Sequence, residues 1–271
     1  MKRILLTLLL ASCGGGSGGN APPQELVQRT DGLYFTYYGG EQGQVAAVAE
    51  HTNLMHSIPW DGPDVQIAEM QQAKARGIGI MLDLPEAWST GTSEIAVRAR
   101  FQQLQALDLI SSVKAIYPVD EPDLAGLGTN QIGTTNAMIR RVMAEFGMNV
   151  PIAVIYSASF TWPGIQHYDW VGFDNYDANI FGNGDYNRLK AVVRKDQRIL
   201  LVPGGADKWR QDPAPFLAQA QKDGQVIAIL AFIWRDNSDP ARGASLGIKS
   251  NGMKRAYCAA GRTAINRPGI C

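Results

Sequence analysis

The sequence predicts an α/β fold, a (β/α)8 TIM barrel in a single domain, and three observations support it. From residue 33 onward, short β-branched or aromatic runs alternate with amphipathic helical stretches. Eight such runs begin between residues 33 and 226, a mean spacing of about 28 residues, which is the length of one strand-plus-helix unit. The chain has 271 residues, and barrels of this type have about 250.

The eight predicted strands are short and rich in apolar residues. They lie at 33–38, 54–58, 78–84, 113–119, 151–156, 170–175, 198–203 and 226–234. An open, doubly wound sheet is the alternative, but it usually has fewer strands. Such a sheet often carries a glycine-rich phosphate fingerprint after its first strand, and Gly39-Gly40 lacks the GxGxxG spacing.

The predicted helices combine an apolar stripe with helix start and stop signals. They lie at 42–50, 64–76, 93–109, 129–146, 185–195, 213–222 and 252–260. Ser93 opens the third helix, and Gly77 and Gly147 follow the second and the fourth. Only the fifth unit is weak, because 159–166 contains Trp162-Pro163-Gly164 and predicts a loop or a single turn.

The overall composition excludes several classes of protein. The chain carries 25 Lys+Arg against 25 Asp+Glu and is 45% hydrophobic, which is unlike a disordered, collagen-like or polytopic membrane protein. The balanced charge argues against nucleic acid or an anionic membrane surface as the main partner. We expect a monomer.

The first thirty residues have the pattern of an export signal and a tether. Lys2 and Arg3 precede a seven-residue apolar run that is too short to span a bilayer, and residues 10–13 read Leu-Ala-Ser-Cys. This tetrad resembles the lipobox of bacterial lipoproteins, which implies a signal peptide at 1–12 and lipidation of Cys13. Residues 13–30 then form a glycine-rich tether, and residues 31–271 form the barrel domain. The alternative is an ordinary cleaved signal with an incidental cysteine.

This reading places the protein outside the cytoplasm. We expect it to be anchored by its N-terminal lipid to the bacterial outer membrane or cell surface, with the periplasmic face as the alternative. In an exported chain the remaining cysteines, Cys258 and Cys271, can pair and tie the last helix to the C-terminus. Two cysteines and three scattered histidines offer no metal-ligand spacing, so no metal or other cofactor is expected.

Carboxylates and aromatic residues gather at the predicted strand ends, where a barrel builds its functional face. The chain as a whole is only 18% charged and 8% aromatic. Aromatic rings stack on sugars and carboxylates bind sugar hydroxyls, so we expect a carbohydrate ligand. The predicted substrate-binding residues are Tyr37, Asp83, Asp120, Tyr176, Trp234 and Asn237. For the tyrosines, packing at the barrel rim is the alternative.

The most informative run is 115–122 (AIYPVDEP), which places two adjacent carboxylates at the end of the fourth strand. Here the chain resembles the clan A glycoside hydrolases, barrel enzymes whose fourth strand ends in Asn-Glu, often followed by Pro. The resemblance implies that Glu121 is the acid/base and that Asp120 takes the place of the Asn that contacts the sugar 2-hydroxyl. Adjacent carboxylates also raise the pKa of one member, which suits a proton donor. The alternative is a turn cap before the next helix.

The resemblance fails at strand seven. That clan places its nucleophilic Glu there, whereas 200–205 reads LLVPGG and the nearest acid, Asp207, lies beyond two glycines. Trp234 matches the aromatic residue that the clan places at the end of strand eight.

A second carboxylate must therefore come from another strand. Asp174, in the run 171–177 (VGFDNYD), is the preferred candidate, and Asp83 is the second. Carboxylates about 5 Å apart indicate a retaining enzyme, and roughly 6.5–9.5 Å an inverting one. A purely structural role for Asp174 is the alternative.

The sequence thus predicts a glycoside hydrolase acting on a polysaccharide or oligosaccharide. Glu121 is the predicted general acid/base, and Asp174 the nucleophile or base. One alternative is a barrel that has lost catalysis and acts as a carbohydrate-binding surface lipoprotein, which the missing strand-seven Glu favours. A lyase or aldolase would need a buried lysine or a metal cluster.

Overall fold

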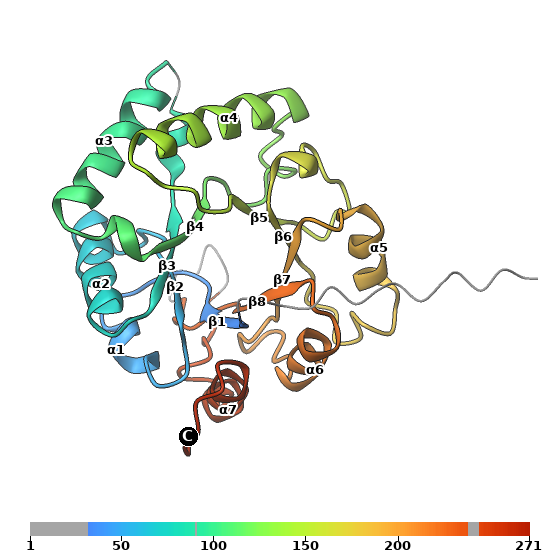
Figure 1. Cartoon of the computed structure of the whole chain (residues 1–271). Coiled ribbons are helices and arrows are strands. Elements are labelled where there is room, and N and C mark those ends of the chain that lie inside the picture. Colours follow the sequence, from blue (N-terminus) through green and yellow to red (C-terminus); the bar gives the residue numbers. More distant parts are fainter. Residues whose placement is uncertain (1–31, 90, 238–243) are drawn as a thin grey trace, which may run out of the picture.

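A computed structural model describes residues 32–89, 91–237 and 244–271 of the chain. The predicted signal peptide (1–12) and the predicted tether (13–30), with its predicted lipidation site Cys13, lie outside the described residues. Within the described ranges, parallel strands form an inner ring and helices form an outer one, as Figure 1 shows. This arrangement confirms the predicted (β/α)8 fold.

The inner ring contains eight strands among the described residues. They are β1 (Tyr34–Tyr37), β2 (Leu54–His56), β3 (Gly79–Asp83), β4 (Val113–Tyr117), β5 (Ala153–Tyr156), β6 (Trp170–Asp174), β7 (Arg198–Val202) and β8 (Val226–Ala231). Their pairing gives one sheet in the order β1-β8-β7-β6-β5 and another in the order β2-β3-β4. All named pairs are parallel.

Hydrogen bonds also join the two sheets at both seams. Between β1 and the start of β2, the Phe35 N–H donates to Asn53 Oδ1 over 2.9 Å. Between β4 and β5, the Ile116 N–H donates to the Pro151 carbonyl over 2.9 Å, and Ile116 bridges Ile152. The strands are therefore neighbours in chain order, and their carboxyl ends share one rim.

A helix follows every strand except β5. The helices are α1 (Gln44–Val48), α2 (Pro63–Ala75), α3 (Ser93–Ala106), α4 (Thr129–Glu145), α5 (Asp185–Val192), α6 (Ala214–Lys222) and α7 (Lys254–Ala264). Three 3-10 turns accompany them: η1 (Pro85–Trp88), η2 (Ile110–Ser112) and η3 (Ile165–His167). The single turn η3 confirms that the fifth unit lacks a full helix. Among the described helices, none combines the length and apolarity needed to cross a bilayer.

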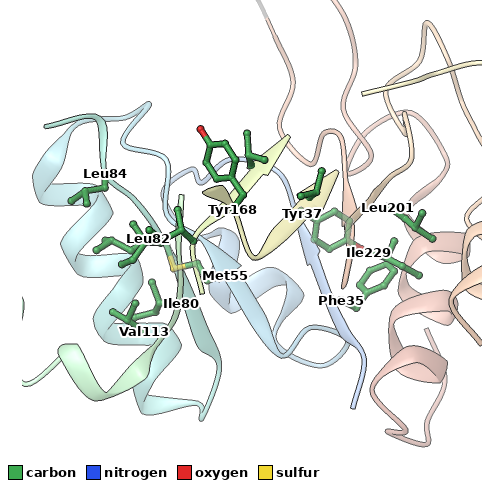
Figure 2. Packing of buried hydrophobic residues seen from close by; sticks show 14 of the residues in the cluster. Phe35, Tyr37, Met55, Ile80, Leu82, Leu84, Val113, Tyr168, Leu201 and Ile229 are labelled. Carbon is green, nitrogen blue, oxygen red and sulfur yellow. The ribbon is translucent and has the colours of Figure 1, made fainter. Parts of the chain in front are cut away.

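Buried side chains separate into two layers because successive strand residues point to opposite faces. One layer, which we call the outer cluster, packs the strands against the helices. Figure 2 shows part of it, including Phe35, Tyr37, Leu82 and Ile229. The other layer, the inner cluster, fills the ring itself. Its members are Tyr38, Leu54, Met81, Ala115, Tyr117, Ala153, Ile155, Trp170, Leu200, Val202, Ile227, Ala228 and Leu230.

The predicted eighth strand is longer than the observed one. The prediction extends to Trp234, whereas β8 ends at Ala231 and only an isolated bridge joins Phe232 to Gly204. The regular strand therefore ends before Trp234, which lies in the outer cluster and not among the residues inside the ring.

Cys258 and Cys271 form a disulfide, as predicted. Cys258 is buried on α7, and the bond joins two residues 13 apart in the sequence. The last helix is thereby tied to the C-terminal segment. Closing a loop of this length restricts the unfolded chain and stabilises the fold by about 3 kcal/mol.

The double variant Cys258→Ser/Cys271→Ser is expected to lower the free energy of unfolding by about 3 kcal/mol. Urea unfolding of this variant and of the oxidised native chain measures the difference. Native chain treated with a reductant should match the variant. Equal unfolding midpoints for the oxidised chain and the variant would show that the bond does not constrain the unfolded state.

Candidate active site

The two-residue period of the strands decides which side chains reach the interior at the carboxyl rim. Asp83 shares a face of β3 with Met81, and Asp174 shares a face of β6 with Trp170. Because Met81 and Trp170 belong to the inner cluster, both carboxyl groups point into the ring. Tyr38, His56, Tyr117 and Phe232 occupy equivalent positions on their strands. The rim therefore brings acids and aromatic rings together.

Asp120 is held firmly at the end of β4. Its Oδ1 accepts a hydrogen bond from the Tyr117 hydroxyl over 2.5 Å, and its backbone bridges Ile155. Burial raises the pKa of Asp120, while the hydrogen bond from Tyr117 opposes that shift by favouring the charged form. Asp120 is thus a fixed acceptor that remains exposed to solvent.

Glu121 follows directly and is only half-buried. Its backbone N–H donates to the Ile155 carbonyl over 3.0 Å, and its φ of 42° lies in the left-handed region, which is strained for a residue other than glycine. Burial raises the pKa of Glu121, and the nearby charges of Asp120 and Asp123 raise it further. Glu121 therefore keeps its proton to a higher pH than an ordinary glutamate.

Asp174 is the most enclosed of these acids. Burial raises its pKa well above the ordinary value, and the charges of Asp120 and Glu121 add to the shift. The Tyr176 hydroxyl approaches the carboxyl, yet Asp174 Oδ1 makes no aligned hydrogen bond with any described residue. Asp174 therefore keeps its proton to a higher pH than an ordinary aspartate.

Asp83 lines a pocket of about 400 Å³ beside Asp120. Burial raises the pKa of Asp83 to about 7, with further contributions from the charges of Glu86 and Asp120. The rest of the wall is mainly apolar and aromatic. It comprises Tyr38, Ile58, Trp60, Pro85, Trp88, Pro118, Val119, Ala125 and Leu127. Glu121 and Asp174 do not line this pocket; they interact electrostatically with Asp120 at its edge.

Aromatic rings cover the interior of the ring from β1 to the loop after β7. Tyr38 and Phe232 have ring centroids 5.2 Å apart, and Phe232 stacks on Tyr176 at 5.6 Å. Tyr176 in turn contacts Trp209, with centroids 4.0 Å apart. The hydroxyls of Tyr38 and Tyr176 are inaccessible to solvent. They approach the carboxyl groups of Asp120 and Asp174, respectively, and favour the charged forms of these acids.

His56 lies below Tyr38 and Tyr117, with ring centroids 4.8 Å and 4.7 Å away. Its Nδ1 accepts a hydrogen bond from the Gly39 N–H, which leaves the proton on Nε2. Burial lowers the pKa of His56 to about 3, so the ring stays neutral. It acts as support for the two tyrosines.

The end of β7 offers no carboxylate, in agreement with the sequence. Gly204 continues the inward face of Leu200 and Val202, and a Cβ atom there would lie 2.6 Å from Tyr176 Cδ1. The Tyr176 ring thus occupies the space that a side chain at this position would need. Asp207, the nearest acid in the chain, is exposed to solvent.

Two predicted substrate-binding residues lie elsewhere. Tyr37 is fully buried between the strands and the helices, where its hydroxyl bonds His51 Nε2 over 2.9 Å. Trp234 packs beside it, with ring centroids 5.0 Å apart. The prediction took the wrong member of a tyrosine pair and the wrong aromatic after strand eight. The inward residues are Tyr38 and Phe232. Tyr37 and Tyr38 are consecutive and point to opposite faces, whereas Phe232 and Trp234 would share a face of a continuous strand and differ because β8 ends at Ala231.

The remaining predictions for the site have mixed outcomes. The structure brings Asp83, Asp120, Glu121, Asp174 and Tyr176 together at the rim. Asn237 lies beyond β8, where its backbone pairs with Ser245 in an antiparallel bridge. Nearby, Arg235 bonds Asp61 over 2.9 Å and links this loop to the loop after β2. No group of three potential metal ligands occurs among the described residues.

No protein-family model and no curated protein sequence matches the chain. Solved structures with a similar fold include a β-glucuronidase from an uncultured Clostridium sp., with a TM-score of 0.58 and 12% identity over 88% of this chain. The chain spans 53% of that enzyme's length.

Two neighbours are similar to this chain over almost their whole length. A GH113 β-1,4-mannanase has a TM-score of 0.58 and 10% identity, with coverage of 88% of this chain and 100% of the mannanase. A GH128 endo-β-1,3-glucanase from Pseudomonas viridiflava has a TM-score of 0.54 and 12% identity, with coverage of 86% and 98%. At these identities the likeness establishes a shared barrel fold of the kind found in glycoside hydrolases.

Asp83 is expected to make stability depend on pH. Its pKa is about 7 in the fold against an ordinary 3.8, so between about pH 4 and pH 7 the folded chain holds a proton that the unfolded chain releases. Stability from this group is full below that window and falls as pH rises through it. Asp83→Asn should therefore stabilise the protein at pH 8 by roughly 1–3 kcal/mol and have little effect at pH 4.

Thermal or urea unfolding across this pH range measures the effect. Asp207→Asn, the same change at an exposed position, is the matched control and should leave the pH profile as it is. A parallel profile for Asp83→Asn and the native chain would contradict the buried environment of Asp83.

Proposed function

We propose that the protein hydrolyses glycosidic bonds in a polysaccharide or oligosaccharide, with Glu121 as the general acid/base. The observation that carries this proposal is the position of Glu121. A half-buried carboxylic acid with a raised pKa follows a fixed carboxylate at the barrel rim, beside an aromatic-lined pocket. The fold shared with glycoside hydrolases supports the same reaction class.

The reaction needs a proton for the leaving oxygen, and Glu121 has the properties of that donor. A raised pKa keeps it protonated where an ordinary glutamate has ionised, and its partial exposure lets a substrate reach it. Aromatic rings such as Trp60, which is 43% exposed, provide faces on which sugar rings stack.

The role proposed for Asp174 depends on whether its carboxyl group is protonated. As a nucleophile or base it must be ionised, which its enclosure opposes in the free protein. We propose Asp174 as the second carboxylate, the nucleophile or base, in its ionised form.

A second candidate function is carbohydrate binding without catalysis. The space at the end of β7, filled by Tyr176 and closed to a carboxylate, is the observation that favours it. The intact pair of Asp120 and Glu121 favours catalysis.

The variant Glu121→Gln separates the two functions. Removing the general acid should lower the rate of reducing-end release by about 10²–10⁴-fold while the affinity for the same glycan changes little. The native rate should fall as pH rises through the raised pKa of Glu121. Glu145→Gln, on the outer helix α4, is the matched control and should keep full activity.

Three outcomes are distinct. Full activity of Glu121→Gln would overturn the assignment of the acid. A native chain that binds glycans and cleaves none of a broad panel would establish the binding function. A native chain that neither binds nor cleaves any glycan would remove both candidates.

The export prediction becomes part of the proposal. A disulfide between Cys258 and Cys271 supports an oxidising compartment. We expect cells that express the full chain to incorporate labelled palmitate into it, and the Cys13→Ala variant to lose the label and the membrane association. Label retained by that variant, or a mature chain that starts at another residue, would contradict lipidation at Cys13.

A further inference from the structure

The pocket at the end of β3 has a lining of one charge sign. Among the described residues that line it, Asp83 and Asp120 are acidic, none is basic, and the others are apolar or aromatic. Its volume of about 400 Å³ is sufficient for one sugar unit. The charge and the aromatic rings of this lining restrict the chemical class of the ligand.

Asp83 is held in place, but its carboxyl group has no partner within the protein. The Asp83 N–H donates to Ser57 Oγ over 3.0 Å, which fixes the end of β3. No hydrogen bond or ion pair joins the carboxyl oxygens to another described residue. The side chain is only partly buried and lines the pocket, so a ligand can reach it.

The charged neighbours of Asp83 are mostly of its own sign. Burial is the main cause of its raised pKa, and the charges of Glu86 on η1 and Asp120 after β4 raise it further. Arg100 on α3 opposes them, but its guanidinium already donates to Gln66. The pKa of about 7 reflects a negative charge that is poorly compensated. A cation bound in the pocket would supply the missing charge.

Trp60 and Trp88 contribute indole rings to the same pocket. The face of an indole ring attracts a cation. The structure contains one such contact, because the guanidinium of Arg235 lies 5.4 Å from the centre of the Trp60 ring. Arg235 is itself paired with Asp61 over 2.9 Å and does not line the pocket. The aromatic walls are therefore compatible with a positively charged ligand.

Three classes of sugar differ in how they match this lining. A uronate or a sulfated sugar brings a further negative charge beside Asp83 and Asp120, and no basic residue in the described lining receives it. A neutral sugar forms hydrogen bonds but leaves the carboxylate charge uncompensated. A sugar with a free amino group carries an ammonium, which donates to a carboxylate in a charge-assisted hydrogen bond. The amino sugar is the best match.

We propose, resting on the function proposed above, that the pocket binds a sugar unit with a free, positively charged amino group, and that the substrate is a glycan that contains such units. The ammonium donates to the Asp83 carboxylate, and Asp120 adds negative charge to the same pocket. Trp60 and Trp88 contact the sugar ring. Asp83 is then a specificity-determining residue, and the chemical step stays with the acids assigned to it above.

A panel of methyl glycosides tests the ligand class. Its members carry an amino, a hydroxyl or an acetamido group at carbon 2, or a carboxylate at carbon 6, in the glucose and galactose configurations. Measured by calorimetry, the amino member should bind at least about 10-fold more tightly than the others, as expected for a charge-assisted bond. Butylamine, a cation without a sugar ring, should bind more weakly than the amino member.

The outcomes of the panel are distinct. Equal affinity for the amino and hydroxyl members, or tightest binding of the carboxylate member, would overturn this inference and leave the carbohydrate function standing. Butylamine that binds as tightly as the amino sugar would also overturn it, because a cation alone would then be recognised. No binding by any sugar would remove the carbohydrate ligand itself, and this inference with it.

The variant Asp83→Asn keeps the size of the side chain and removes its charge. It should weaken the amino member by about 10–100-fold and the hydroxyl member far less, because only the first forms the charge-assisted bond. Asp207→Asn, the same change at an exposed position, is the matched control and should keep native affinities. Equal losses for both sugars would indicate a structural role for Asp83 and contradict recognition of the ammonium.

Proton release on binding tests the contact directly. A positive charge beside Asp83 favours its carboxylate, so at about pH 6 the complex should hold fewer protons than the free chain. Calorimetry in buffers with different ionisation enthalpies measures this difference. The native chain should release protons to the amino sugar and not to the hydroxyl member, and Asp83→Asn should release fewer. Equal release by the native chain and the variant would show that the ammonium does not reach Asp83.

Chemical N-acetylation extends the test to cleavage. Treating polyglucosamine with acetic anhydride neutralises its amino groups and leaves its linkages unchanged, so the rate of reducing-end release should fall at least about 10-fold. An equal or higher rate on the acetylated polymer would overturn this inference while the glycosidase stands. A chain that prefers the amino sugar in the panel but cleaves neither polymer would support the ligand assigned to the pocket and count against hydrolysis.

Discussion

The two-residue period of the parallel strands is the constraint on which the rest of this structure depends. It sends alternate side chains to the outer cluster, under the helices, and to the inner cluster, inside the ring. Because neighbouring strands are in register, the last inward residues of β1, β3, β4 and β6 meet at one rim. Tyr38, Asp83, Tyr117 and Asp174 are brought together in this way from positions spread over more than half of the chain.

Burial then decides the chemistry of the acids that meet there. Aromatic rings and apolar walls exclude water, which raises the pKa of Asp83, Asp120, Glu121 and Asp174 in common. The specific neighbours of each acid then make the four acids differ from one another. The Tyr117 hydroxyl favours the charged form of Asp120, while burial raises the pKa of Asp174 well above its ordinary value. One cluster of similar side chains thus contains acids with different tendencies to ionise.

The end of β7 has no room for a side chain at Gly204. Gly204 allows Tyr176 to approach within a distance that excludes any side chain there, and Tyr176 continues a row of rings from Phe232 to Trp209. The site is thus closed where a second carboxylate would lie and open at the pocket beside Asp120.

The sequence by itself determined the fold class, the eight strands, the missing fifth helix and the disulfide, because these depend on local periodicity and on the identity of two cysteines. It also located the adjacent acids at the end of β4. Only the tertiary structure decided that Tyr38 and Phe232, and not Tyr37 and Trp234, face the interior. A shift of one residue in a strand moves every side chain to the opposite face of the sheet, and an early end to β8 changes where the following side chains point. The contacts across the ring decide which side chains lie inside it. The same contacts place Tyr176 beside Gly204 and bury the Oδ1 atom of Asp174. A local sequence pattern cannot predict these contacts, because the residues concerned lie on different strands.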